Sequence, residues 1–296
     1  MSDPAVPFTD KTQLREDLYA NAGKLSARSD LHERFGTNPQ PFADWELGLV
    51  DLSGVRRALD AGCGSGNFLL PLARRLVPAG AEVIGLDLSD GMLTTARERL
   101  AAEGLSVACQ VGDVEALPFA DSTFDLILAN YMLYHLPHLD QGIAELRRVL
   151  KPGGVLLAAT NSERNMPELL DLGLRACQEA GVPEATLRAV VQGGRLAAPV
   201  NFTLESGAEA LGRSFADVRV ERYPGELRVT DADALTAYFA SMWVVDMVVN
   251  SAEQAPDARA ALRARLVECF RAVVAADIAR DGMVRISKDT GAFAAR

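Results

Sequence analysis

The chain has 296 residues, of which 49% are hydrophobic, so it is long enough to bury a sizeable core. Its formal net charge of −10 argues against the phosphate backbone of a nucleic acid as partner. Its four cysteines are widely scattered and form no C-x-x-C pair, so we predict neither a metal site nor a disulfide framework and expect a reducing compartment.

Residues 1–53 are predicted to form an N-terminal helical lid. The first residues lack the basic and apolar regions of a signal peptide. No run in the chain approaches the roughly 18 apolar residues that a membrane span needs, so we expect a cytoplasmic protein without a membrane partner. Apolar residues recur at partly helical spacing from Lys11 to Phe35, interrupted near Asn21, and further helical turns are expected after Trp45.

Residues 54–160 are predicted to form an α/β core in which strands and helices alternate. Strands are expected at about 56–61, 82–87, 107–111, 124–129 and 155–159. Asp90 is the expected N-cap of the helix that ends at Gly104. Apolar runs without strict alternation are typical of parallel strands covered on both faces, so we predict a doubly wound sheet.

Residues 161–215 are predicted to form a helical cap inserted after strand five. Its helices are expected at about 166–180, 183–192 and 204–213. The cap and the N-terminal lid would together form the roof of a substrate pocket.

Residues 216–296 are predicted to complete the core. A sixth strand is expected at 218–223 and a last strand at 283–293. Between them, Thr230 can cap one helix and Pro256 can begin another. The first of these helices carries an apolar stripe that is interrupted by Asp246.

A glycine-rich turn joins the first strand to its helix, in the run Leu59-Asp60-Ala61-Gly62-Cys63-Gly64-Ser65-Gly66. Glycine permits positive φ and lets a ligand lie against the backbone, and the helix that follows offers unpaired N–H groups. The Asp60 carboxylate just before the turn suits a cationic amine and would repel phosphates. The turn therefore predicts a ligand site.

Two further acids follow strands at the same edge of the predicted sheet, where open α/β sheets bind ligands. Asp87 ends the second strand and can accept hydrogen bonds from a ribose diol. Asp113 follows the third strand and can accept from an exocyclic amine such as that of adenine. Together they predict an adenosine-containing ligand.

A nicotinamide cofactor is one alternative, which would expect G-x-G-x-x-G. Here Asn67 stands at the position of the third glycine, and the chain offers a glycine at 66 instead. A nicotinamide site would also leave Asp113-Val114 unexplained. An NAD(P)-dependent oxidoreductase is therefore the weaker interpretation.

The motifs and their order resemble those of the class I S-adenosylmethionine-dependent methyltransferases, and among them the small-molecule type 11 group that includes ubiquinone/menaquinone-biosynthesis-like enzymes. The glycine turn resembles their first motif, Val83–Ser89 followed by Met92 their acidic loop, and Gly112–Phe119 their adenine loop. Phe124–Asn130 and Leu150–Gly154 match later motifs. The resemblance implies a Rossmann-like seven-stranded sheet, parallel except for an antiparallel last strand.

The resemblance also implies a site for S-adenosyl-L-methionine. Gly62 and Gly64 would approach its methionine part, Asp87 its ribose, and Asp113 with the Val114 N–H its adenine, while Asn130 would supply backbone contacts near the amine. The predicted cofactor-binding residues are Asp60, Gly62, Cys63, Gly64, Asp87, Leu88, Met92, Gly112, Asp113, Val114 and Asn130.

His135, shortly after the fourth strand, is the main catalytic candidate, because a histidine can accept a proton from a hydroxyl or amine near neutral pH. Its alternative role is to position the cofactor or the lid. Tyr19 is the second catalytic candidate. The candidate substrate residues are Tyr19, His32, Tyr134 and Trp243, and packing is the alternative for each of them.

The predicted function is methyl transfer from S-adenosylmethionine to oxygen, nitrogen or carbon of a small molecule, in secondary or cofactor metabolism. A cofactor-retaining enzyme that does not methylate, such as a cyclase, is the main alternative. Base methylation of nucleic acids is disfavoured, because the chain reads Asn130-Tyr131-Met132-Leu133 where such enzymes carry an Asn/Asp-Pro-Pro-aromatic tetrad. The sequence does not indicate an oligomeric state.

Overall fold

Seven strands form one sheet in the order β3-β2-β1-β4-β5-β9-β6. The computed structural model describes residues 9–14, 23–192, 201–253 and 255–296. The strands are β1 (Arg57–Ala61), β2 (Glu82–Asp87), β3 (Ala108–Val111), β4 (Phe124–Leu128), β5 (Leu150–Asn161), β6 (Val218–Tyr223) and β9 (Thr290–Ala295). β1 to β5 pair in parallel, and β9 is antiparallel to both β5 and β6. The Rossmann-like sheet with an antiparallel last strand is thereby confirmed.

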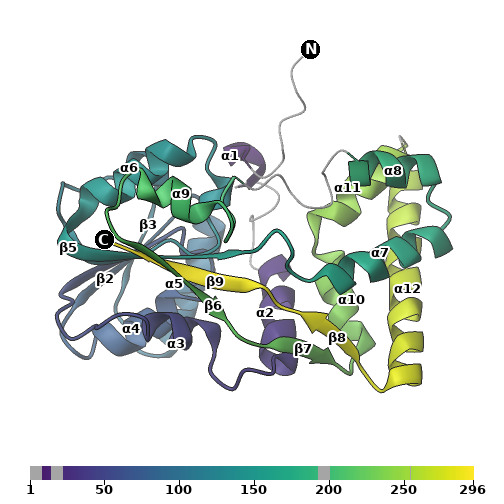
Figure 1. Cartoon of the computed structure of the whole chain (residues 1–296), viewed down its shortest axis with the longest axis horizontal. Coiled ribbons are helices and arrows are strands. Elements are labelled where there is room, and N and C mark those ends of the chain that lie inside the picture. The colour runs from purple at the N-terminus through teal and green to yellow at the C-terminus, as the bar shows by residue number, and fades with distance from the viewer. Residues whose placement is uncertain (1–8, 15–22, 193–200, 254) are drawn as a thin grey trace, which may run out of the picture.

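Helices cover both faces of this sheet, as its apolar strands require. One face carries α3 (Phe42–Leu47), α4 (Leu69–Leu76) and α5 (Asp90–Ala102), and the other carries α6 (Leu139–Val149) and α9 (Gly207–Gly212) (Figure 1). Two short 3₁₀ helices, η2 (Val114–Ala116) and η3 (Leu133–His135), follow β3 and β4. These elements and the sheet form the sheet lobe.

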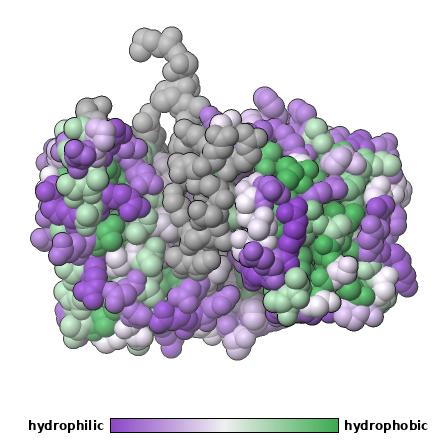
Figure 2. Space-filling view, turned by 180° about the vertical axis from the view of Figure 1, so that it is seen from behind, coloured by the Kyte–Doolittle hydropathy of each residue, from purple (hydrophilic) through white to green (hydrophobic). Residues whose placement is uncertain are grey.

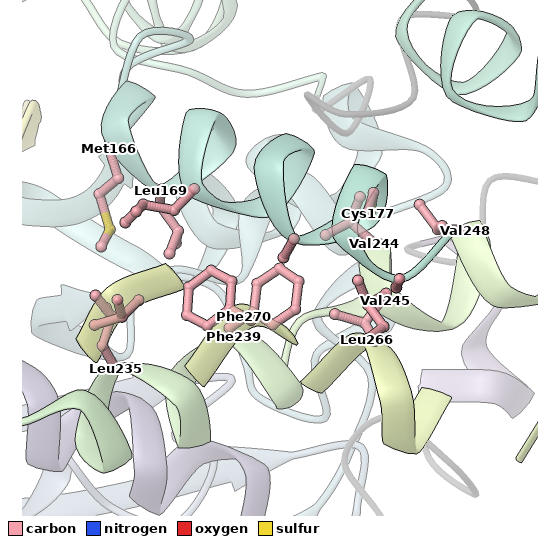
Figure 3. Close-up of a cluster of buried hydrophobic side chains, with 14 of the residues drawn as sticks. Met166, Leu169, Cys177, Leu235, Phe239, Val244, Val245, Val248, Leu266 and Phe270 are labelled. Carbon is pink, nitrogen blue, oxygen red and sulfur yellow. The ribbon is translucent and has the colours of Figure 1, made fainter. Parts of the chain in front are cut away.

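A second lobe consists of helices that pack on one another beside the sheet (Figure 1). Its helices are α7 (Pro167–Glu179), α8 (Glu184–Gln192), α10 (Ala232–Ala240), α11 (Trp243–Ala252) and α12 (Pro256–Asp281). At its centre the rings of Phe239 and Phe270 stack with centroids 3.9 Å apart, next to Leu169 and Leu266 (Figure 3). The helices after β6 therefore pack with α7 and α8, whereas α9, which was expected in the cap, lies on the sheet.

A two-stranded ribbon of β7 (Glu226–Val229) and β8 (Val284–Ser287) continues β6 and β9 and reaches the helical lobe (Figure 1). The strand expected at 283–293 is thus interrupted at Lys288 and Asp289, and β7 was not predicted. The loop at 162–165 binds the backbone at this interruption. The Asp289 carbonyl accepts from the Ser162 N–H at 2.8 Å, and its own N–H donates to Asn165 Oδ1 at 2.9 Å.

The N-terminal region contributes α1 (Lys11–Gln13), near the sheet lobe, and α2 (Gly23–Phe35), which lies between the two lobes (Figure 1). The Arg28 guanidinium fastens α2 to the end of α10, donating to Ser241 Oγ at 3.1 Å and to its carbonyl at 2.7 Å. Residues 15–22 lie outside the described residues.

Three helix ends differ from the prediction. The N-cap of α5 is Ser89 and not Asp90, because the Ser89 hydroxyl accepts from the Met92 N–H at 3.3 Å. The N-cap of α10 is Asp231 and not Thr230. The helix expected to run from there to Val249 breaks at Ser241, where Arg28 binds the backbone carbonyl.

Three further observations concern the helices and the surface. Within the described ranges, no single helix is long and apolar enough to cross a membrane, and only α10 together with α11, bent by 65°, matches by combined length and composition. Asp246 on α11 pairs with Arg263 at 3.0 Å. Figure 2 shows hydrophobic side chains gathering more on the sheet lobe than on the helical lobe.

Candidate functional site

The glycine turn after β1 adopts a backbone that favours glycine at all three positions. Gly62, Gly64 and Gly66 have φ of +74°, +52° and +88°, a region that other residues rarely enter. The Gly62 and Cys63 N–H groups both donate to the Leu86 carbonyl, at 2.7 and 3.0 Å. The turn is therefore held against the end of β2.

Asp87 joins the glycine turn to the loop after β2. One carboxylate oxygen accepts from the Gly64 N–H at 2.7 Å, and the other accepts from the Ser89 N–H at 2.9 Å. Burial raises the pKa of Asp87, and these two N–H donors act against that rise. Each oxygen keeps a lone pair for a further donor.

Two buried carboxyl groups lie near the turn. Asp60 on β1 is 1% exposed, and Glu46 on α3 is fully buried. Glu46 Oε2 accepts from Asn130 Nδ2 at 2.6 Å, but Glu46 Oε1 and Asp60 Oδ2 have no hydrogen-bond partner among the described residues. Burial raises the pKa of each group to about 8, and the charge of Asp60 adds to the rise at Glu46.

The buried carboxyl groups of Asp60 and Glu46 favour the binding of a cation near them. A buried carboxyl that lacks a partner is unfavourable, and two of them repel each other when both are ionised. A positively charged group between them would relieve both penalties. Sequence reasoning missed Glu46, whose only signal is a lone acid between Trp45 and Leu47.

The end of β4 is strained. Tyr131 directly follows Asn130 and has a positive φ of +53°, which is rare for a bulky residue and recurs at functional sites. Its hydroxyl shares a hydrogen bond of 2.7 Å with Thr290 Oγ1. Asn130 accepts from the Ala159 N–H at 2.8 Å, so its side chain bridges β5 and Glu46.

The loop after β3 carries an ion pair. Asp113 caps η2 by accepting from the Glu115 N–H at 2.9 Å, and its other oxygen is 2.5 Å from Lys11 Nζ. Lys11 also pairs with Glu115. The Gly112 N–H donates to the Asp87 carbonyl at 2.9 Å. Lys11 therefore occupies the carboxylate oxygen that was expected to face adenine.

The remaining predicted cofactor residues lie at the same edge of the sheet. Cys63 is buried, and burial raises the pKa of its thiol. Met92 and Val114 are also buried, at 1% and 4% exposure, while Leu88 is partly exposed. The structure thus brings the three predicted loops together, and the role of each residue in binding stays a prediction.

The predicted catalytic and substrate residues do not gather at one point. His135 and Tyr134 lie together on η3, with ring centroids 4.5 Å apart. Trp243 begins α11 and packs against the core of the helical lobe. His32 lies on α2 with its ring 5.8 Å from that of Tyr238. Tyr19 lies outside the described residues.

Part of the chain, including the glycine turn, is similar to known methyltransferases. A family model described as a methyltransferase domain matches residues 59–158. The chain is 40% identical over 154 residues to the ubiquinone/menaquinone biosynthesis C-methyltransferase UbiE of Bordetella avium, covering 52% of this chain and 59% of that protein. It is 44% identical over 114 residues to the malonyl-[acyl-carrier protein] O-methyltransferase of Erwinia pyrifoliae, covering 38% of this chain and 40% of that protein.

A solved structure of similar shape spans both lobes. The [4+2]-cyclase SpnF superimposes with a TM-score of 0.53 at 19% identity, covering 96% of this chain and 95% of that one. At this identity the likeness concerns the fold alone. By sequence, the chain spans 59% and 40% of the lengths of the two curated relatives above.

Proposed function

We propose that the chain binds S-adenosyl-L-methionine where the glycine turn meets Asp87 and transfers a methyl group to a small molecule. Residues 59–158 belong to the methyltransferase domain family, within the type 11 group of the class I S-adenosylmethionine-dependent enzymes. S-adenosyl-L-methionine is the cofactor of this family. When bound, it supplies a methyl group already activated on a positively charged sulfur.

The observation that carries the proposal is the pair of buried carboxyl groups beside the glycine turn. Asp60 Oδ2 and Glu46 Oε1 have no hydrogen-bond partner in the described part of the chain, and the methionine part of the cofactor carries an ammonium in addition to its sulfonium. When ionised, the same carboxyls would repel the pyrophosphate of a nicotinamide cofactor, and when neutral they would offer it no positive charge. The residues therefore fit the methyl donor and disfavour the alternative.

The other predicted contacts support the same placement. Asp87 is oriented by the Gly64 and Ser89 N–H groups, which leaves acceptor capacity for ribose hydroxyls. Asp113 would receive the adenine amine once its oxygen is released by Lys11.

The protein itself contributes to the reaction chiefly by aligning the acceptor with the methyl group. Holding an acceptor in line with an activated methyl group, in a site closed to water, can supply most of the rate. His135 on η3 would accept a proton where the acceptor is a hydroxyl or an amine. The acceptor atom can be oxygen, nitrogen or carbon, and we place the reaction in cytoplasmic secondary or cofactor metabolism.

Product mass tests this proposal against a non-methylating enzyme on the same fold. The full chain is incubated with isotope-labelled S-adenosylmethionine and a small-molecule extract. We expect a labelled methyl in a product made by the wild type and not by Asp87→Asn. Conversion of a metabolite without gain of the label would instead identify a cofactor-retaining enzyme, and an unchanged extract would contradict both.

A further inference from the structure

The His32 side chain lies near two other polar side chains, those of Tyr238 and Lys288. His32 comes from α2, Tyr238 from α10, and Lys288 from the break between β8 and β9. The rings of His32 and Tyr238 lie edge to face, with centroids 5.8 Å apart and planes at 87°. Lys288 is close enough to His32 to lower its pKa by charge repulsion.

Lys288 is a half-buried cation. Its ammonium lies 4.9 Å from the centroid of the Tyr223 ring, and burial lowers the pKa of Lys288. No carboxylate of the described residues forms an ion pair with it. A cation–π contact offsets only part of the desolvation of an ammonium, so the position favours an added anion.

The backbone around Lys288 is fixed on both sides. Ser287 donates to both carboxylate oxygens of Glu168, through its N–H at 3.0 Å and its hydroxyl at 2.5 Å. Asp289 is held by Asn165 at 2.9 Å. The backbone that carries Lys288 is therefore held in place at both neighbouring residues.

The neighbouring groups are also under-partnered. His32 Nδ1 is buried and has no hydrogen-bond partner among the described residues. Burial and the charge of Lys288 lower the pKa of His32 to about 3, so its imidazole is neutral at pH 7. The Tyr238 hydroxyl donates to Met166 Sδ at 3.4 Å, and a thioether is a weak acceptor that a carboxylate oxygen would improve on.

Aromatic rings link this cluster to the predicted methyl site. Tyr223, under the Lys288 ammonium, is 5.0 Å from Phe42 between ring centroids. Phe42 is in turn 5.7 Å from Tyr131 and 6.0 Å from Phe68. Tyr131 follows the end of β4, and Phe68 follows the glycine turn. Aromatic contacts therefore run from Lys288 to the glycine turn.

We propose that Lys288, together with Tyr238 and His32, binds the carboxylate of an acceptor whose apolar body lies against the aromatic side chains between the lobes. This inference rests on the proposed methyl transfer and specifies its substrate class as a small apolar or aromatic carboxylate.

Matched acids and amides test the inference on the full chain saturated with S-adenosylhomocysteine. The probes are benzoate and 4-hydroxybenzoate, against benzamide and 4-hydroxybenzamide. Binding is measured by calorimetry and by fluorescence of Trp45, whose ring is 5.2 Å from that of Tyr223. We expect the acids to bind at least about 10-fold more tightly than their amides, the ratio typical of one charge-assisted hydrogen bond.

Variants separate charge from folding. Lys288→Gln should bring the acid-to-amide ratio close to one, and Lys288→Arg should retain a preference for the acid. Arg285→Gln, on the exposed side of β8, is the matched loss of charge and should keep the wild-type ratio. Thermal melts establish that each variant is folded.

The outcomes are distinct. Equal binding of acids and amides, binding of none of the four probes, or an unchanged ratio in Lys288→Gln would overturn the anion site. Failure of S-adenosylhomocysteine to bind the wild type would instead overturn the proposed function, and the acid preference can be measured without it.

Discussion

The two halves of the candidate site differ in how the chain builds them. At the cofactor edge, Gly64, Asp87 and Asp113 belong to loops that follow consecutive parallel strands, and backbone hydrogen bonds tie these loops together. Between the lobes, His32, Tyr238 and Lys288 come from three segments far apart in sequence. The cofactor edge is specified by local sequence motifs. The cluster between the lobes depends on how the helical lobe packs on α2 and the ribbon.

The largest expected effect is a loss of stability in the helical lobe that leaves cofactor binding unchanged. Phe239→Ala removes a ring stacked on Phe270 in the lobe's core and should lower the free energy of unfolding by about 3–5 kcal/mol. Cofactor affinity below the melting temperature should stay close to that of the wild type. Chemical denaturation measures the loss, with the exposed Leu170→Ala as control, expected within about 0.5 kcal/mol.

A strong fall in cofactor affinity for Phe239→Ala, at a temperature where it remains folded, would show that the two regions are coupled and would break the comparison.

Asp87→Asn tests the cofactor edge itself. The change removes the negative charge of the carboxylate that accepts hydrogen bonds from the Gly64 and Ser89 N–H groups. Charge-assisted hydrogen bonds contribute about 1.5–3 kcal/mol each. We expect S-adenosylhomocysteine to bind about 100-fold more weakly by calorimetry. Asp90→Asn, which alters an exposed acid three residues later, should leave affinity unchanged, and equal effects of the two changes would refute the role of Asp87.

Asp60→Asn should change stability and binding in opposite directions. Burial raises the folded pKa of Asp60 from its ordinary value of 3.8 to about 8, so unfolding releases a proton between these values and wild-type stability falls as pH rises from about 4 to 8. Asparagine removes this contribution, and the variant should gain stability relative to the wild type as pH increases. Its cofactor affinity should fall by about 10-fold, since one counter-charge is lost.

Melting temperatures across that pH range measure the first effect and calorimetry the second. A stability difference that does not depend on pH would show that Asp60 does not titrate in the fold.

The smallest effect concerns Lys11, which holds one oxygen of Asp113 at 2.5 Å. Partly exposed ion pairs contribute about 0.2–1 kcal/mol. Lys11→Gln should free that oxygen for the adenine amine and tighten cofactor binding by at most about 5-fold, as a competition titration can resolve. Weaker binding would mean instead that Lys11 supports the bound cofactor.

The contrast also explains what the sequence could predict. The alternation of strands and helices, the glycine turn and the position of Asp87 follow from patterns that lie within a few residues of one another. Glu46 could not be assigned, because its burial depends on α3 packing beside β4 and on the bond from Asn130. The interruption of the last strand at Lys288 depends on the 162–165 loop, which lies more than a hundred residues away in the chain.

Helix ends show the same limit on a smaller scale. Thr230 and Asp231 are both good capping residues, and only the geometry of the turn selects Asp231. The break after α10 depends on Arg28 of α2, so an apolar stripe that continues across Ser241 cannot reveal it.

Calorimetry of S-adenosylmethionine and S-adenosylhomocysteine with the full chain, in buffers of different ionisation enthalpy, tests the central claim most directly. We predict saturable binding that releases protons at pH 7, because a bound cation lowers the raised pKa values of Asp60 and Glu46. The release should be smaller in Asp60→Asn. Absence of saturable binding of either compound would contradict the account.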